Sequence, residues 1–295
     1  MKFMTRGEKI FNVFNYIFIG LVCLLCALPI IHILAVSFSS AQYVVGGRVS
    51  FWPMGFTIES YTFAFRSGRF MTAFWVSIQR VTLGLIVNMF LLVTTAYPLS
   101  KTTQEFSARN YYMAFFAITM IFGGGIIPFY ILISDLGMLD SIWSLVIPGG
   151  LPVFSMIILM NFIRGLPKEL EEAAMIDGAG YFSVLALIML PVLKPALATV
   201  ALFSFVHHWN EWLLGMLFMN DPSNFPLQTY LQVLLTNFSD LIRAMGPDFM
   251  QLVARMNERS GRAAQLFLGL IPILVIYPFL QKYFTKGLVI GSVKG

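Results

Sequence analysis

The sequence predicts an all-α membrane protein with six transmembrane helices, and three observations support this fold class. Of its 295 residues, 58% are hydrophobic and only 11% are charged, whereas soluble globular proteins carry roughly 25% charged residues. The mean hydropathy is +0.80. The apolar residues form continuous runs, whereas a membrane-spanning β-strand would alternate polar and apolar residues. Because a spanning segment must pair its own backbone groups, these runs predict helices.

Six runs reach the roughly 20 residues that cross a hydrocarbon core. They cover residues 14–36, 71–97, 112–133, 142–162, 192–218 and 264–284. The first run follows three basic residues and resembles a secretory signal, but it is longer than the apolar region of such a signal, so we expect an uncleaved helix. In the third run, Gly123–Gly125 predict a flexible or close-packed point within the helix. We expect residues 1–295 to form a single transmembrane domain.

The distribution of lysine and arginine orients the predicted spans. Cytoplasmic loops of membrane proteins carry an excess of these residues. The bias places both termini and the loop 164–191 in the cytoplasm, and it places two long loops, 37–70 and 219–263, outside. The net charge of +5 follows from the same bias, so we expect no nucleic-acid partner.

The sequence contains no catalytic or cofactor-binding motif. It lacks the G-x-x-x-x-G-K-[ST] phosphate loop, and it shows no set of nucleophile, base and orienting residue. Cys23 and Cys26 lie inside the first apolar run, where the polar surroundings that redox or metal chemistry needs are missing. We therefore expect a chain that is not an enzyme and binds neither metal nor cofactor, with any chemical energy supplied by a partner.

The predicted cytoplasmic loop carries the clearest local signals. Pro167 suits the first turn of a helix, three glutamates follow where the helix dipole favours negative charge, and Gly178 suits a left-handed cap. We predict a helix over 168–177 and a second short helix over 181–190 that stops at Pro191. Three residues share one face of the first helix at the i, i+3, i+4 spacing: Leu170, Ala173 and Ala174. Two interpretations are open, a docking knob for a partner protein and a helix lying on the membrane surface.

The same loop resembles the EAA loop of bacterial ABC importer permeases. The resemblance comprises Glu172, Ala173 and Ala174, then Asp177 and Gly178, and finally Ile188-x-Leu190-Pro191. It implies a type I ABC importer permease fold. It also implies that the loop forms a coupling helix, whose residues from Glu172 to Gly178 fit into a cleft of an ATP-binding subunit.

Two further motifs are similar to those of the carbohydrate-uptake branch of this family. Trp209-Asn210-Glu211-Trp212 resembles its W-N-E/D-aromatic motif, and the segment 281–295 resembles the ending of MalG-like subunits, although Ser292 stands where these often carry Gly or Ala. The tail implies that Lys294 and Gly295 reach between the ATPase subunits. The nearest resemblance is to LplC-type permeases, which are associated with oligosaccharides, including plant-polysaccharide and uronate fragments.

Ionisable residues inside spans are functional candidates. Arg80 in the second span and the 209–212 motif in the fifth are candidates for a substrate pathway, since Trp209 and Trp212 offer flat apolar faces and Asn210 and Glu211 offer acceptors for sugar hydroxyls. Arg80 could also bind a uronate carboxylate or pair with Glu211. An architectural role is the alternative, in which the motif holds the fifth helix in register.

The resemblance implies a permease subunit of an ATP-driven importer for oligosaccharides in the bacterial cell membrane. Its implied partners are a second, non-identical permease, a dimer of ATP-binding subunits that hold ATP and magnesium, and an extracellular solute-binding protein facing the loop 219–263. Two alternatives remain at this stage. One is an ABC permease for another solute, and the other is a secondary transporter that needs no ATPase.

Overall fold

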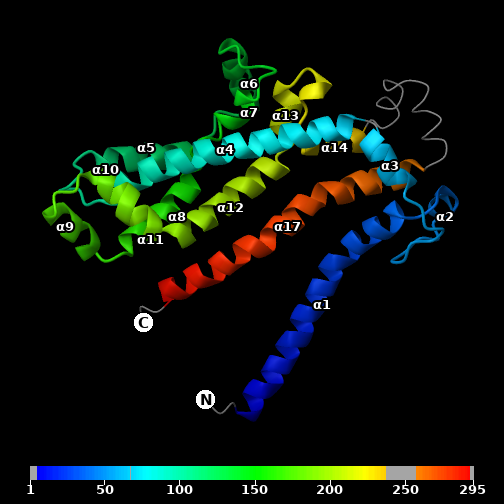
Figure 1. Ribbon diagram of the computed structural model, residues 1–295, viewed down its shortest axis with the longest axis horizontal. Helices are drawn as coiled ribbons and strands as arrows, with labels where there is room; N and C mark the ends of the chain where they lie inside the picture. The colour runs from blue at the N-terminus through cyan, green and yellow to red at the C-terminus, as the bar shows by residue number, and fades with distance from the viewer. Residues whose placement is uncertain (1–4, 67, 237–256, 293–295) are drawn as a thin grey trace. The chain divides into compact units, whose positions relative to one another are not determined.

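The computed structural model describes residues 5–66, 68–236 and 257–292, and within these ranges the regular structure is helical apart from one isolated β-bridge between Ser39 and Phe56 (Figure 1). The chain divides into two compact units. Unit 1 comprises Met1–Met71 and Leu231–Ile271, and unit 2 comprises Thr72–Tyr230 and Pro272–Gly295.

Unit 1 is built on the long helix α1. Among the described residues, the helices that it holds in full are α1 (Arg6–Ser37), α2 (Ala41–Val45) and α3 (Glu59–Arg66), and α17 (Glu258–Ser292) begins in it. A capping box between Thr5 and Glu8 starts α1, with the Glu8 N–H donating to Thr5 Oγ1 at 3.3 Å. The end of α1 packs in a small core of Ala35, Val44 and Val49. The predicted outside loop 37–70 thus contains two helices rather than a plain connector.

Unit 2 surrounds the packing of α8 against α5 and α12. Its elements are α4 (Arg69–Ser100, which begins in unit 1), α5 (Arg109–Ile121), α6 (Ile126–Asp135), α7 (Trp143–Val146), α8 (Val153–Arg164), α9 (Glu169–Ile176), α10 (Tyr181–Ser183), a π-helical segment (Val184–Met189), α11 (Leu190–Val192), α12 (Lys194–Asn210), α13 (Leu213–Phe218), a 3₁₀ turn (Pro222–Asn224), the start of α14 (Leu227–Thr236) and the part of α17 from Pro272 on. In Figure 1, α9, α10 and α11 lie at one end of this unit, and α6, α7 and α13 lie at the other.

The helices confirm an all-α membrane fold, while the count of six spans stays a prediction. Within the described residues, three helices are long and apolar enough to cross a membrane: Gly7–Ser37, Arg69–Ser100 and Glu258–Pro278. These contain the first, second and much of the sixth predicted spans. Two bent pairs raise the number to five if each pair is one span, and α8 is a shorter apolar helix.

The third predicted span is not one continuous helix. It consists of α5 and α6, which meet at 114° across a break that includes Gly123–Gly125. Gly125 has φ +83°, which an L-residue with a side chain rarely adopts. A Cβ at Gly123 or Gly124 would meet nothing within 4 Å. The glycines therefore break the helix and are not a close-packed point within it.

The fourth and fifth predicted spans are also interrupted. The fourth consists of α7 and α8, separated by a turn that contains Gly149, Gly150 and Pro152. The fifth ends as a helix at Asn210 and resumes as α13 after Glu211 and Trp212. Hydropathy sums over a window, so it does not register where one or two residues leave the helical conformation.

The cytoplasmic loop of the sequence prediction folds largely as expected. The helix expected over 168–177 is α9, Glu169–Ile176. The second short helix was expected to stop at Pro191, which is wrong, because helical structure continues to Val192. Pro191 has no N–H to donate to the carbonyl four residues earlier, and the preceding turn widens into the π-helical segment instead of ending.

Asp140 joins the second halves of two interrupted spans, which end in α6 and α13. Its backbone has φ +56°, in the left-handed region that non-glycine residues seldom occupy. Its carboxylate accepts hydrogen bonds from Asn220 Nδ2 at 2.9 Å and from the Asp221 N–H at 3.1 Å, and its N–H donates to the carbonyl of Phe218. Beneath it, α6, α7 and α13 share a small apolar core. Asp140 therefore holds the segment after α6 against the segment after α13.

We expect Asp140→Asn to lower Tm at neutral pH. The hydrogen bonds, first that of the Asp221 N–H and then those of Asn220, lower the pKa of Asp140, so its ionised form stabilises the fold. That contribution is present above the unfolded pKa of about 3.9 and is lost as the pH falls through the lower, folded pKa. The difference in Tm between wild type and variant should therefore shrink in acid. Asparagine tolerates positive φ about as well as aspartate does, so the substitution adds no backbone strain. A difference independent of pH would contradict this account.

Candidate functional site

Helix α9 is a short, sharply bounded helix. It begins after Pro167 with three glutamates in its first turn. It ends in a Schellman motif, in which the Ala179 N–H donates to the Ala174 carbonyl at 2.9 Å and the Gly178 N–H donates to the Met175 carbonyl at 3.0 Å. Gly178 has φ +86°, as the sequence predicted for the residue after Asp177.

The face that α9 exposes agrees only in part with the predicted face, because Leu170 and Ala173 are exposed as expected and Ala174 is not. Ala174 is only 8% exposed and packs into the core of unit 2, so its side chain points inward. Glu172 and Ala173 are exposed, and Ile176 is 86% exposed. The exposed stripe therefore follows Glu169, Glu172, Ala173 and Ile176 at the i, i+3, i+4, i+7 spacing, which we call the α9 outer face.

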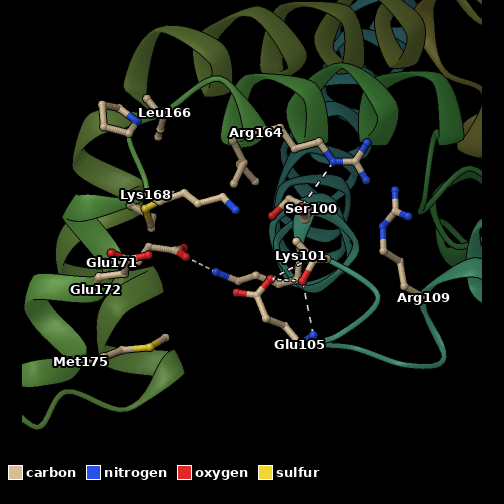
Figure 2. A pocket seen from close by; sticks show the side chains of 14 residues that line it. Ser100, Lys101, Glu105, Arg109, Arg164, Leu166, Lys168, Glu171, Glu172 and Met175 are labelled. Atoms are coloured by element: carbon tan, nitrogen blue, oxygen red, sulfur yellow. Dashed lines mark hydrogen bonds and ion pairs between the residues drawn. The ribbon is translucent and has the colours of Figure 1, made fainter.

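An ion pair between Lys101 and Glu171 fixes α9 to the loop after α4 (Figure 2). The Lys101 ammonium also lies 4.3 Å from the centre of the Tyr97 ring. In the same loop, Glu105 Oε2 accepts from Thr102 Oγ1 at 2.7 Å and from the Thr102 N–H at 2.8 Å, and these bonds hold the pKa of Glu105 below its usual value. No sequence pattern signals the Lys101–Glu171 pair, because its partners are 70 positions apart.

The predicted pairing of Arg80 with Glu211 is present in the structure. Arg80 lies on α4 with 0% of its side chain exposed. Its Nη2 donates to Glu211 Oε2 at 2.8 Å, and its Nη1 donates to the Glu211 backbone carbonyl at 2.9 Å. The other carboxylate oxygen of Glu211 accepts from the Leu214 N–H at 2.8 Å, at the start of α13. One arginine and one glutamate thus close both ends of the break between α12 and α13.

The buried surroundings of this pair are closely packed. Trp209 is 1% exposed, stacks on Phe205 at 6.0 Å and meets Phe74 edge to face at 6.0 Å. One turn beyond Arg80 on α4, Gly84 faces His208 so closely that any Cβ would overlap the imidazole ring. We did not anticipate this contact, since a glycine in an apolar run carries no signal of what it packs against.

The predicted pathway residues divide into two groups. Arg80 and Trp209 are buried and Glu211 is partly buried, so these three form the architecture of the helix break. Asn210 is exposed and Trp212 is 38% exposed, so these two remain available to a substrate. The predicted docking residues Lys294 and Gly295 lie outside the described residues.

The chain was compared with known proteins. No family model matches it. Protein LplC of Bacillus subtilis (strain 168) is 38% identical over 291 residues, covering 99% of this chain and 97% of that protein. The polygalacturonan/rhamnogalacturonan transport system permease protein YtcP of the same organism is 34% identical, over 98% of this chain and 99% of that protein.

A solved structure shares the fold. It is the crystal structure of a bacterial ABC transporter involved in the import of the acidic polysaccharide alginate. One of its chains matches with a TM-score of 0.87 and 29% identity, over 96% of this chain and 100% of that chain.

The chain is therefore a multi-pass permease subunit of an ABC transporter, a transport component and not itself an enzyme. Within this class it belongs to the carbohydrate-uptake branch of importer permeases, of the LplC type. Membership of this family favours the ATP-driven interpretation over the secondary transporter that needs no ATPase.

We expect Gly178→Ala to loosen the end of α9. A side chain at φ +86° costs about 1 kcal/mol, which corresponds to a roughly fivefold change in an opening equilibrium. Amide exchange of Gly178's neighbour Ala179 should accelerate by about that factor. The matched control is Gly180→Ala, because Gly180 has φ −76° and open space at its Cβ. Equal exchange rates in the two variants would show that the cap does not hold the helix end.

We expect Arg80→Met to lower Tm strongly, because it leaves the partly buried Glu211 carboxylate without its cation. Removing one partner of a buried pair costs about 3–5 kcal/mol, whereas replacing both partners is far less costly. The double variant Arg80→Met/Glu211→Gln should therefore regain part of the loss in detergent-solubilised protein. Arg48→Met, at an exposed position, serves as the control. An unchanged Tm in the Arg80 variant would show that the pair does not stabilise the break.

Proposed function

We propose that this chain is one half of a heterodimeric permease that imports acidic oligosaccharides. The observation that carries the substrate class is similarity along nearly the whole chain to two proteins whose names refer to polygalacturonan and to alginate. Relatives named for arabinooligosaccharides and maltodextrin are less similar than YtcP, at 25% and 28% against 34% identity. Uronate fragments are therefore the substrates to test first, and neutral oligosaccharides are the second candidate.

The proposed complex contains a second permease, two ATP-binding subunits that hold ATP and magnesium, and an extracellular solute-binding protein. Both termini and α9 lie in the cytoplasm, in agreement with the distribution of lysine and arginine. The loop 219–263 faces the solute-binding protein. In the described part of this loop, α14 and the start of α17 are helical, and residues 237–256 lie outside the described residues.

The α9 outer face is the proposed docking surface for an ATP-binding subunit. It presents the large apolar side chain of Ile176 beside the methyl group of Ala173 and the charge of Glu172. The opposite face of α9 is fixed to unit 2 through Ala174 and through the Lys101–Glu171 pair. A displacement of α9 by a docked subunit would therefore move the packed core of unit 2 rather than deform only a flexible loop.

We expect Ala173→Arg to weaken the association with the ATP-binding subunits about tenfold, since a bulky charge in a docked face costs about 1–2 kcal/mol. Arginine is a good helix former and Ala173 is exposed, so α9 itself is preserved. The complex would be purified with its partners, and ATPase activity would be measured in lipid with the solute-binding protein and panels of acidic and neutral oligosaccharides. Thr103→Arg is the control, because Thr103 is exposed in the loop after α4, two residues from the Lys101 that pairs with α9.

This experiment tests the substrate class and the docking surface independently of each other. Stimulation by uronate oligosaccharides, lost in Ala173→Arg and kept in Thr103→Arg, supports both parts. Stimulation by neutral sugars alone overturns the substrate class but keeps the docking. Full association and activity of Ala173→Arg would exclude the α9 outer face as the docking surface.

A further inference from the structure

A cavity of about 420 Å³ lies in unit 2 between the C-terminal ends of α4 and α8 and the helix α9 (Figure 2). Four basic side chains line it: Lys101, Arg109, Arg164 and Lys168. Three helix ends meet here, since Ser100 ends α4, Arg109 begins α5 and Arg164 ends α8. Because α4 is an apolar span, this level corresponds to a membrane surface, where phospholipid headgroups lie.

Two of the arginines converge on one oxygen atom. Arg109 Nε donates to the Leu99 carbonyl at 2.9 Å, and Arg164 Nη2 donates to the same carbonyl at 3.0 Å. Among the described residues, neither guanidinium forms an ion pair with a carboxylate, and neither does Lys168. Three positive charges therefore line one cavity without a carboxylate at ion-pair distance, and Glu105 acts on Lys168 only at longer range.

The acidic residues of the cavity have other partners or lie across it. Glu171 is paired with Lys101, and Glu105 is held by Thr102. Glu171 and Glu172 belong to α9, and Figure 2 draws them on the opposite side of the cavity from Arg109 and Arg164. The carbonyls at the end of α4 do not neutralise the two guanidinium groups that cap them, because the C-terminal end of a helix carries only about half an elementary negative charge.

We propose that Arg109, Arg164 and Lys168 bind a phosphate group, supplied by the headgroup of an anionic phospholipid or by free phosphate. Arg109 also donates from Nη1 to Asn110 Oδ1, and Arg164 also donates from Nε to the Ser100 carbonyl, which leaves Nη2 of Arg109 and Nη1 of Arg164 to donate to phosphate oxygens. Basic pockets at the cytoplasmic ends of spans suit lipid headgroups. Lys168 directly precedes α9, so the bound phosphate would tie the start of α9 to the ends of α4 and α8. The binding itself does not depend on the proposed docking of ATP-binding subunits.

The test uses the permease complex in nanodiscs of three kinds: phosphatidylcholine alone, phosphatidylcholine with phosphatidylglycerol, and phosphatidylcholine with added inorganic phosphate. Tm and the phosphatidylglycerol retained in native mass spectrometry are measured for wild type, Arg109→Gln/Arg164→Gln, Lys168→Gln and the control Arg48→Gln. Lys168 is exposed and caps no carbonyl among the described residues, so its variant should fold even if loss of the arginine caps does harm.

We expect retained phosphatidylglycerol to fall about tenfold in the double variant and less in Lys168→Gln, with Arg48→Gln unchanged. A rise in Tm with phosphatidylglycerol alone identifies the lipid as the source, and an equal rise with inorganic phosphate identifies free phosphate. Retention and Tm that are the same in wild type and both variants would overturn the proposal. The proposal would also be overturned if the variants lost the ATP-binding subunits while neither lipid nor phosphate changed Tm. That outcome would assign the cations to an acidic surface of a partner protein.

Discussion

The pairing of Arg80 with Glu211 is the interaction on which the architecture of unit 2 depends. It meets two requirements that would each be costly alone. A guanidinium with no exposed surface needs an anion, and a helix that ends inside an apolar segment needs donors for its last carbonyls and acceptors for the next N–H groups. Arg80 supplies one donor to the carbonyl of Glu211, the residue that caps α12, and Glu211 supplies the anion together with an acceptor for α13.

The second span buries polar and small residues that a helix in water would expose. Its buried side carries Ser77, Arg80, Gly84 and Asn88 between apolar residues such as Val81 and Leu92, while the large apolar residues Ile86 and Phe90 are exposed. Ser77 accepts from the N–H of Leu227 at 2.7 Å, and Asn88 Oδ1 lies 3.4 Å from His208 Nε2. In lipid, apolar surface gives little drive for helix packing, so close approach at small residues and hydrogen bonds between helices stabilise the bundle.

Sequence reasoning succeeded where the signal is local. The caps of α9, the apolar length of α1 and α4, and the absence of a phosphate loop can all be read from neighbouring residues. It failed where the outcome depends on distant partners. The inward turn of Ala174 follows from packing against the core, and the Lys101–Glu171 pair depends on a loop 70 positions away. For Arg80, the sequence left open a substrate carboxylate and Glu211 as partners, and the fold shows that Glu211 is the partner.

The interrupted spans limit what can surround this chain in a membrane. Residues 122–125 are exposed and not helical, so their backbone groups have few partners within the span. Unpaired backbone groups are tolerated at membrane depth only where protein covers them or where they line water. At membrane depth, the backbone groups of the break between α5 and α6 would need a protein surface or water beside them rather than lipid. A permease half that pairs with a second half around a pathway provides both environments. A continuous helix would leave no such groups unpaired, so the interruption carries a cost in lipid that only surroundings of this kind offset.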